Sequence, residues 1–190
     1  YEQVTAARRL DGIRPGLHVV VVDHLDNSTE SLEEAEAVCS LAQTLIGRMW
    51  HDPSATDGPR APAPGGPGAP APGRPLTARD LIVIPPYNRQ ADRIRAVLRG
   101  AGLEDVRVGT VDKFQGQEAP VAILSMAASS HAEVSRGMGF LLDRHRLNVG
   151  ISRGQYAAYV VRSRVLTDFS PGSPDELIAL GAFLRLHPRP

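Results

Sequence analysis

The sequence predicts a three-layer α/β domain in which helices cover both faces of a mostly parallel sheet. Short runs rich in valine, isoleucine and leucine lack polar alternation, as expected for strands buried on both faces. Most of these runs are followed by a segment whose apolar residues recur at helical spacing. Such alternation favours parallel strands joined by crossover helices. The 190 residues are enough to bury one sizeable core.

The first strand and helix lie in the amino-terminal quarter of the chain. Val19–Val22 follows a Pro-Gly turn and reads as a buried strand. The capping residues of 26–29 come next, and Glu30–Arg48 then carries apolar side chains at helical spacing. This order predicts the beginning of a βαβ unit.

A Pro/Gly/Ala-rich segment interrupts the pattern. From Pro53 to Pro75, prolines, glycines and alanines fill 18 of 23 positions, a composition that cannot hold a helix or a strand ladder. We expect a disordered insertion over 52–78 within a single domain, 1–190. The alternative is a boundary between two domains, but the first flank offers only one strand and one helix, too little to close a core.

After the insertion the alternation of strands and helices resumes. Gly100 and Gly102 stand where a helix would be capped at its carboxyl end. The stretch from Ala127 to Arg136 reads as a loop. The remaining expected elements are strands over 80–85, 106–110, 121–126 and 157–161 and helices over 88–100, 144–153 and 174–186.

Composition limits the function classes. Twenty-one basic residues balance 21 acidic ones, so any contact with nucleic acid must be local. The lone Cys39 excludes an internal disulfide, and the six histidines lack zinc-site spacing, so no metal site is expected. No apolar run has membrane-spanning length, so we expect a cytoplasmic protein that does not enter a membrane. The absence of an initial methionine suggests a piece of a longer chain.

Three polar clusters stand out, and we expect all three to follow strands, because ligands of such sheets bind beyond the carboxyl ends of strands. They are Pro85–Gln90, Gly109–Glu118 and Asn148–Gly154. Together they resemble the TPYxxQ, TVDxFQGxE and NVAxTRAK motifs of superfamily 1 helicases, of the type that acts in nonsense-mediated decay and Okazaki-flap processing. The resemblance is to the carboxyl-terminal motor domain and covers almost the whole chain outside the insertion. It implies a RecA-like fold of the P-loop NTPase type.

By this resemblance, Arg153 is the arginine finger of an ATPase. A guanidinium delivered from a second domain stabilises the charge that gathers on the γ-phosphate during phosphoryl transfer. The other interpretation is a solvated arginine near a helix end. Gly150 and Gly154 replace the family's alanines and Gln155 replaces its lysine, which predicts a more loosely aimed finger.

The second cluster implies contacts of two kinds. The resemblance assigns Thr110 to a phosphate of a single strand and Gln115, Gly116 and Glu118 to the nucleotide, with Glu118 accepting hydrogen bonds from ribose hydroxyls. A strand-end hydroxyl can grip phosphate without reading sequence. The alternative is an ordinary polar turn between two strands, anchored by Phe114.

In the first cluster, Tyr87, Arg89 and Gln90 are expected either to contact nucleic acid or to line the cleft between two motor domains. Pro85 stands where the family often has threonine, which removes one hydroxyl. The loop Ser129–Glu133 combines serine and histidine but has no nucleophile elbow, so a hydrolase triad is not expected.

The parts of a complete motor are missing from this sequence. It contains no glycine-rich phosphate loop, and its sole lysine, Lys113, lies in no such loop. ATP and Mg²⁺ should therefore be held mainly by a first RecA-like domain, supplied in cis or in trans, and the isolated chain should not hydrolyse ATP. The expected substrate is single-stranded DNA or RNA, which phosphate contacts do not distinguish.

Two further readings of function remain open. The chain could be a degenerate, non-catalytic RecA-like module that binds a partner. A flavodoxin-like or nucleotide-sugar domain fits the order of elements but leaves the motifs as coincidences. If the motor reading holds, the parent protein could also fuse a nuclease to the helicase.

Overall fold

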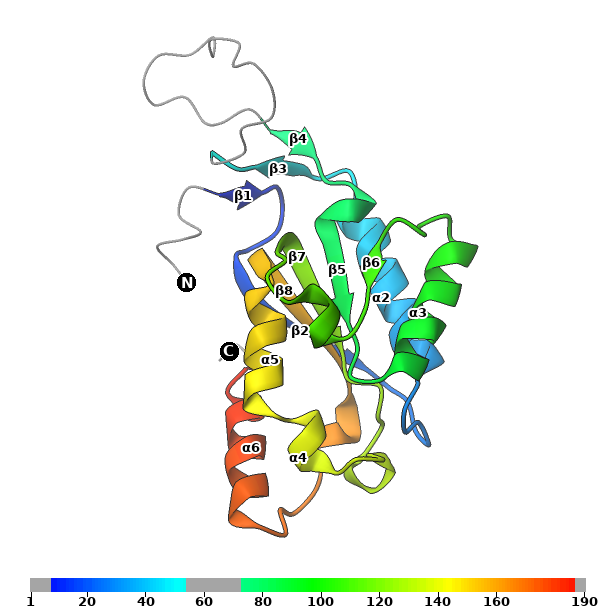
Figure 1. Cartoon of the computed structure of the whole chain (residues 1–190), viewed down its shortest axis with the longest axis vertical. Helices are drawn as coiled ribbons and strands as arrows, with labels where there is room; N and C mark the ends of the chain where they lie inside the picture. The colour runs from blue at the N-terminus through cyan, green and yellow to red at the C-terminus, as the bar shows by residue number, and fades with distance from the viewer. Residues whose placement is uncertain (1–7, 54–72, 187–190) are drawn as a thin grey trace.

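A five-stranded, all-parallel sheet forms the centre of the computed structural model, which describes residues 8–53 and 73–186 (Figure 1). The strand order is β2-β8-β7-β5-β6, with every neighbouring pair parallel. Each of the predicted buried runs is a strand of this sheet. The strands are β2 (Gly16–Val22), β5 (Leu81–Ile84), β6 (Arg107–Val108), β7 (Ala119–Ser125) and β8 (Gly154–Ser163).

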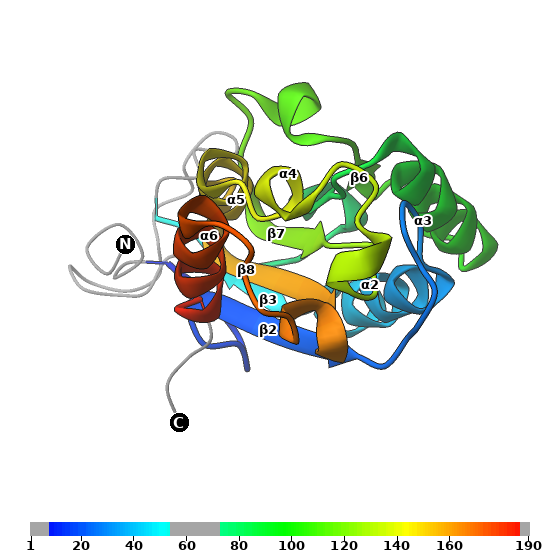
Figure 2. The same ribbon diagram turned by 90° about the horizontal axis from the view of Figure 1, so that it is seen from below.

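Helices cover both faces of the sheet, which confirms the predicted three-layer α/β fold (Figure 2). Along β5, Leu81 and Val83 face a core shared with two helices, whereas Ile82 and Ile84 face a second core. This alternation is the period of a strand buried on both faces. The first core includes α2 (Leu32–Leu45) and α3 (Asn88–Gly100), and the second includes α4 (Met138–Leu141), α5 (Arg144–Ser152) and α6 (Pro174–Leu184).

The local signals in the sequence set several helix ends. Helix α3 spans the residues that the sequence predicts, and its capping glycine, Gly102, has a φ of +71°. The N–H of Leu103 donates to the carbonyl of Leu98 at 2.8 Å, the long-range bond of a Schellman cap. At the other end of the fold, Ser31 caps α2 by accepting the N–H of Glu34.

A small antiparallel sheet, which the sequence did not predict, lies beside the main one. It has the order β1-β3-β4, formed by Arg9–Leu10, Met49–His51 and Arg74–Pro75. The expected insertion of 52–78 is corrected at its carboxyl-terminal end, where Arg74 and Pro75 form β4 and pair with β3. The chain then enters a 3-10 turn, Ala78–Asp80. Residues 54–72 lie outside the described residues, so the insertion itself stays a prediction.

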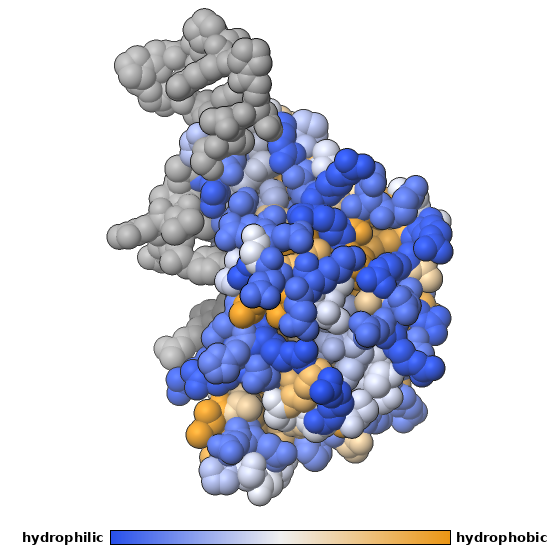
Figure 3. All heavy atoms as spheres, in the orientation of Figure 1, coloured by the Kyte–Doolittle hydropathy of each residue, from blue (hydrophilic) through white to orange (hydrophobic). Residues whose placement is uncertain are grey.

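The connection after β7 also differs from the expected loop. It contains the 3-10 turn His131–Glu133 and is followed by the short helix α4, which the sequence did not predict. Helix α6 carries three exposed apolar side chains, Leu177, Ile178 and Leu184. Hydrophilic residues cover most of the face shown in Figure 3. Within the described ranges, no helix combines the length and apolarity that a membrane crossing requires.

Candidate functional site

Arg153 lies at the amino edge of the sheet, between α5 and β8. It is the carboxyl-terminal cap of α5, and the next residue, Gly154, begins β8. The carbonyl of Arg153 accepts the N–H of Ala119 at 2.9 Å, and Ala119 pairs with Gly154 in the ladder. The arginine is thus fixed to the first residue of β7, directly after the Gly109–Glu118 cluster.

The Arg153 guanidinium is half-buried and bonded only to neutral oxygens. Its Nε donates to the carbonyl of Val149 at 3.0 Å, and Nη2 donates to Oγ of Ser152 at 3.3 Å. A longer bond of 3.4 Å joins Nη1 to the carbonyl of Gln117. No carboxylate of the described residues lies within 4.0 Å of it. The cation therefore caps the negative end of α5 but has no counter-ion.

The predicted nucleotide contacts are exposed residues of the segment whose Gln117 carbonyl accepts from this guanidinium. Gln115, Gly116 and Glu118 are all exposed, and Gly116 has a φ of +75°, which favours glycine. Nε2 of Gln155 donates to Oε2 of Glu118 across 3.4 Å, a weak link between the two motifs. The structure thus brings the predicted finger and the predicted nucleotide contacts to one edge.

The position of these residues corrects the expectation that all three clusters follow strands. Residues 115–118 and 148–153 precede β7 and β8, so they lie at the amino edge of the sheet. The Pro85–Gln90 cluster does follow a strand, β5, and Gly109 and Thr110 follow β6, at the carboxyl edge. A 3-10 turn, Val111–Phe114, connects the two parts, and Phe114 anchors it in the core. The Gly109–Glu118 motif therefore serves two opposite edges.

At the carboxyl edge, two predicted nucleic-acid contacts are buried. The side chain of Gln90 is 0% exposed; it accepts the N–H of Ser31 at 2.7 Å and donates to the carbonyl of Ser31 and to Oγ of Ser125. The Tyr87 ring stacks on Phe140 at 5.6 Å, and burial raises the pKa of its phenol. Both side chains are thus buried in this structure, and their expected contact with nucleic acid or with the cleft between motor domains stays a prediction.

Arg89 remains available at this edge. Its side chain is exposed and lies 3.9 Å from a carboxylate oxygen of Glu30, a distance that contributes little when exposed. Thr110 is half-buried beside the same edge. Of the residues predicted to touch the strand, these two keep accessible polar groups.

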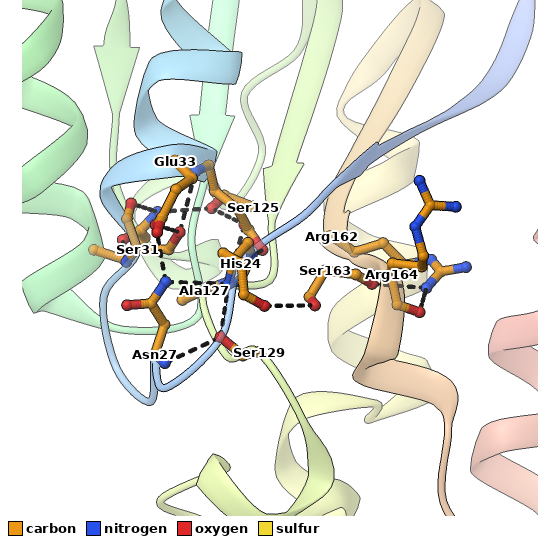
Figure 4. A network of polar contacts seen from close by, with 12 residues as sticks. His24, Asn27, Ser31, Glu33, Ser125, Ala127, Ser129, Arg162, Ser163 and Arg164 are labelled. Carbon is orange, nitrogen blue, oxygen red and sulfur yellow. Dashed lines mark hydrogen bonds and ion pairs between the residues drawn. The ribbon is translucent and has the colours of Figure 1, made fainter.

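A buried polar network, which the sequence analysis missed, holds the carboxyl edge together (Figure 4). Its centre is Glu34 on α2, which accepts Oγ–H of Ser125 at 2.6 Å and the N–H of Ala127 at 3.0 Å. Ala127 has a φ of +68°, a left-handed conformation that costs a non-glycine residue about 1–2 kcal/mol. The available signal was a carboxylate within the apolar stripe of the predicted helix 30–48.

The same network brings a serine, a histidine and a carboxylate into line. Nδ1 of His24 lies 2.7 Å from Oγ of Ser129, and its Nε2 lies 3.1 Å from Oε1 of Glu34. His24 is 6% exposed, and Ser129 and Glu34 are both 0% exposed. No substrate can reach the serine, so the arrangement joins the loops after β2 and β7. Nor do the described residues gather three or more metal-ligating side chains in one place.

A parallel sheet with these two motif-bearing edges defines a RecA-like α/β domain. Comparison with known proteins agrees: residues 20–164 match the family described as AAA domain. The chain belongs to this family, in the part that forms the carboxyl-terminal region of superfamily 1 helicases. The resemblance read from the motifs is thereby confirmed.

Several similar proteins carry helicase names. The chain is 41% identical over 81 residues to human RNA helicase Mov10l1, 41% of this chain and 7% of that protein. It is 44% identical over 78 residues to DNA polymerase alpha-associated DNA helicase A of Schizosaccharomyces pombe, 41% of the chain and 11% of the relative. It is 34% identical over 88 residues to the regulator of nonsense transcripts 1 homolog of Neurospora crassa, which covers 43% of this chain and 8% of that relative. The chain thus matches only a small part of each relative's length.

Proposed function

We propose that this chain is the second motor domain of an ATP-dependent nucleic-acid helicase and that Arg153 is its arginine finger. One observation carries the proposal: a half-exposed guanidinium without a carboxylate partner is tied through its backbone to the edge that presents Glu118. These observations support an aimed cation that has no counter-ion among the described residues.

The hydrogen bonds of Arg153 suit a group that must move. Its acceptors at Val149, Ser152 and Gln117 are neutral, so only the donor is charged in each bond. A bond to a phosphate oxygen joins two opposite charges and adds their Coulomb attraction. Binding of a triphosphate can therefore draw the guanidinium from the end of α5 without disturbing the backbone that positions it.

ATP and Mg²⁺ would be held mainly by a first RecA-like domain, in cis or in trans. This chain would add Glu118, as an acceptor for ribose hydroxyls, and Gln115 and Gly116, which line the same edge. The exposed carboxylate and the left-handed glycine fit a nucleotide that approaches the backbone closely. Bound magnesium supplies charge neutralisation at the phosphates.

A single strand of DNA or RNA would cross the opposite, carboxyl edge. Thr110 and Arg89 would contact its phosphates, which fixes the strand without reading its sequence. Tyr87 and Gln90 would hold this edge in shape from within. The nucleotide and the strand would then meet opposite edges of one sheet, connected by the turn after Thr110.

The alternative function is a degenerate binding module. Gly150 and Gly154, which replace the family's alanines, give this alternative little support. A Cβ on Gly150 would lie 3.0 Å from the Leu124 side chain, and one on Gly154 would collide with the carbonyl of Ala157. Both glycines therefore permit close packing of α5 and β8, which is compatible with a firmly placed Arg153.

Reconstitution with a candidate first motor domain tests the proposal. The wild-type pair should hydrolyse ATP in the presence of a single strand and Mg²⁺, whereas this chain alone should not. We expect Arg153→Ala to lower kcat at least about 10³-fold and to leave nucleotide binding nearly unchanged. Arg99→Gln, on an exposed position of α3, is the matched control. Full turnover with Arg153→Ala would contradict the finger role.

A further inference from the structure

A basic hollow lies along the outer edge of β6, and none of its charged side chains has been assigned a role above. Strand β6 ends the strand order of the main sheet, so one of its sides carries no strand. The hollow has a volume of about 670 Å³, within the roughly 300–1,000 Å³ typical of ligand sites. Its charged lining comprises Arg79, Arg95, Arg107 and Lys113 and two acids, Glu104 and Asp105.

Two cations converge at the carboxyl end of this hollow. Nζ of Lys113 and Nη2 of Arg95 donate to the same backbone oxygen, the carbonyl of Val108, at 3.2 and 2.9 Å. The two charges are therefore no more than about 6 Å apart. Arg95 also pairs with Asp92 at 2.7 Å, but Lys113 has no carboxylate within 4.0 Å among the described residues.

Arg107 adds a third, poorly satisfied cation. Its Nε is buried and has no hydrogen-bond partner within the described part of the chain. Its two Nη atoms make only long bonds, 3.4 Å to Oε1 of Gln117 and 3.5 Å to the carbonyl of Glu118. The buried Nε is out of a ligand's reach, but the exposed Nη atoms, held only by these long bonds, are available to an incoming acceptor.

The acidic side chains lie toward the other end. Asp105 pairs with Arg79 at 3.4 Å, and both it and Glu104 precede β6. The positive end lies beside Thr110, because Lys113 belongs to the 3-10 turn that Thr110 caps and its N–H donates to the carbonyl of Thr110 at 3.0 Å. The side chain of Lys113 lies across Gly109. The absence of a Cβ at Gly109 makes this possible, because a Cβ there would collide with the lysine side chain.

We propose that this hollow is a phosphate-binding site for the single strand, continuing from Thr110 along the outer edge of β6. Lys113 and Arg107 contact phosphodiester oxygens, and Arg95 adds charge beside them. The inference rests on the proposed function, because it extends the path of the same strand. The site also assigns a role to Lys113, the sole lysine of the chain, which has no role in the proposed ATP chemistry.

Salt-dependent binding of a labelled single strand tests this site. The probes are a fluorescent oligothymidylate and an oligouridylate of equal length, titrated with this chain at several salt concentrations and read by anisotropy. Each phosphate contact to a single strand contributes a slope of about 0.7 in log K against log salt. Lys113→Gln and Arg107→Gln should each lower the slope by about 0.7 and weaken binding on the order of fivefold for both probes. Arg99→Gln removes the same charge from an exposed position and should leave the slope unchanged.

The outcomes separate this site from the proposed function. If the wild type binds and Thr110→Val weakens it, but Lys113→Gln and Arg107→Gln match the wild type, the hollow is not on the strand's path. Inorganic tripolyphosphate could compete with the oligonucleotides for the wild type but not for Lys113→Gln, while both proteins bind the oligonucleotides equally. That result would assign the site to a free anion and overturn the proposal. No binding by the wild type would overturn both the site and the helicase proposal.

Discussion

The N–H of Ala119 donates to the carbonyl of Arg153 at 2.9 Å, which joins the first residue of β7 to the carboxyl-terminal cap of α5. The side chain of Arg153 takes its direction from this backbone contact and from the glycine that follows. Changes at the α5–β8 junction should therefore affect the finger even when Arg153 itself is intact.

Gly154→Ala and Gly150→Ala test this junction as a matched pair. A Cβ at Gly154 meets the backbone carbonyl of Ala157, which cannot rotate away, so we expect a loss of about 1–3 kcal/mol in unfolding free energy. A Cβ at Gly150 meets only the side chain of Leu124, and alanine favours the helix by about 1 kcal/mol. Chemical denaturation should show Gly150→Ala as nearly neutral; equal losses would contradict the argument.

Gln90→Met should destabilise the domain rather than simply remove a nucleic-acid contact. The substitution leaves the buried N–H of Ser31 without its acceptor, at a cost of about 1–3 kcal/mol, whereas the carbonyl of Ser31 keeps the N–H of Ala35. Thermal unfolding measures this loss. The neighbouring Arg89→Gln, at an exposed position, should change stability by less than about 0.5 kcal/mol. An unchanged Tm for Gln90→Met would show that its buried bonds contribute nothing.

Glu34→Gln probes the centre of the buried network. Glutamine can keep the bonds to Ser125 and Ala127 but turns an amide NH₂ toward Nε2 of His24, where a carboxylate oxygen now lies. We expect a loss of about 1.5–3 kcal/mol, the value of a hydrogen bond to a charged group. Glu36→Gln, exposed on the same helix, is the control and should unfold like the wild type.

Asp80 should make part of the stability dependent on pH. Burial opposes ionisation of its carboxylate, but hydrogen bonds from Arg74 and Thr77 outweigh it and lower the pKa below the usual 3.8. A lowered pKa means that this stabilisation is complete above about pH 4 and is lost as pH falls through the pKa of the folded state. Asp80→Asn should cost about 1.5–3 kcal/mol at pH 7, with a gap to the wild type that closes below pH 4.

The control for this pH dependence is Asp105→Asn. Its carboxylate pairs with Arg79 at 3.4 Å, but both side chains are mostly exposed. The variant should follow the wild type across the whole pH range. A gap between Asp80→Asn and the wild type that stays constant down to pH 2 would contradict the assignment.

Much of the fold follows from patterns that act locally. Buried β-branched runs and helical spacing predict the five strands of the main sheet and four of the five α-helices in the described part of the chain, and Asn88–Gly100 matches its helix at both ends. The three-stranded sheet was missed because two- and three-residue strands have no period of their own. They exist only through pairing between distant residues, such as Leu10 with Trp50.

The candidate site was predictable in identity but not in placement. The motifs name Arg153 and Glu118, and both precede the predicted strands 157–161 and 121–126, but the expectation that ligands bind beyond the carboxyl ends of strands placed them at the wrong edge. Residue type also misled at Gln90, since a polar side chain reads as exposed although here its partners are buried. The network of His24, Glu34 and Ser129 joins residues about 100 positions apart, beyond the reach of any local pattern.

The antiparallel pairing of β3 with β4 has a consequence for how such a chain can change over time. Met49 lies opposite Pro75, so the segment between them leaves and re-enters the domain at neighbouring points. Its length then adds only a slowly growing closure entropy and does not pull on the strands that carry either edge. Residues can be gained, lost or replaced by another folded module at this point, which makes it the natural place to attach a reporter without altering the motor.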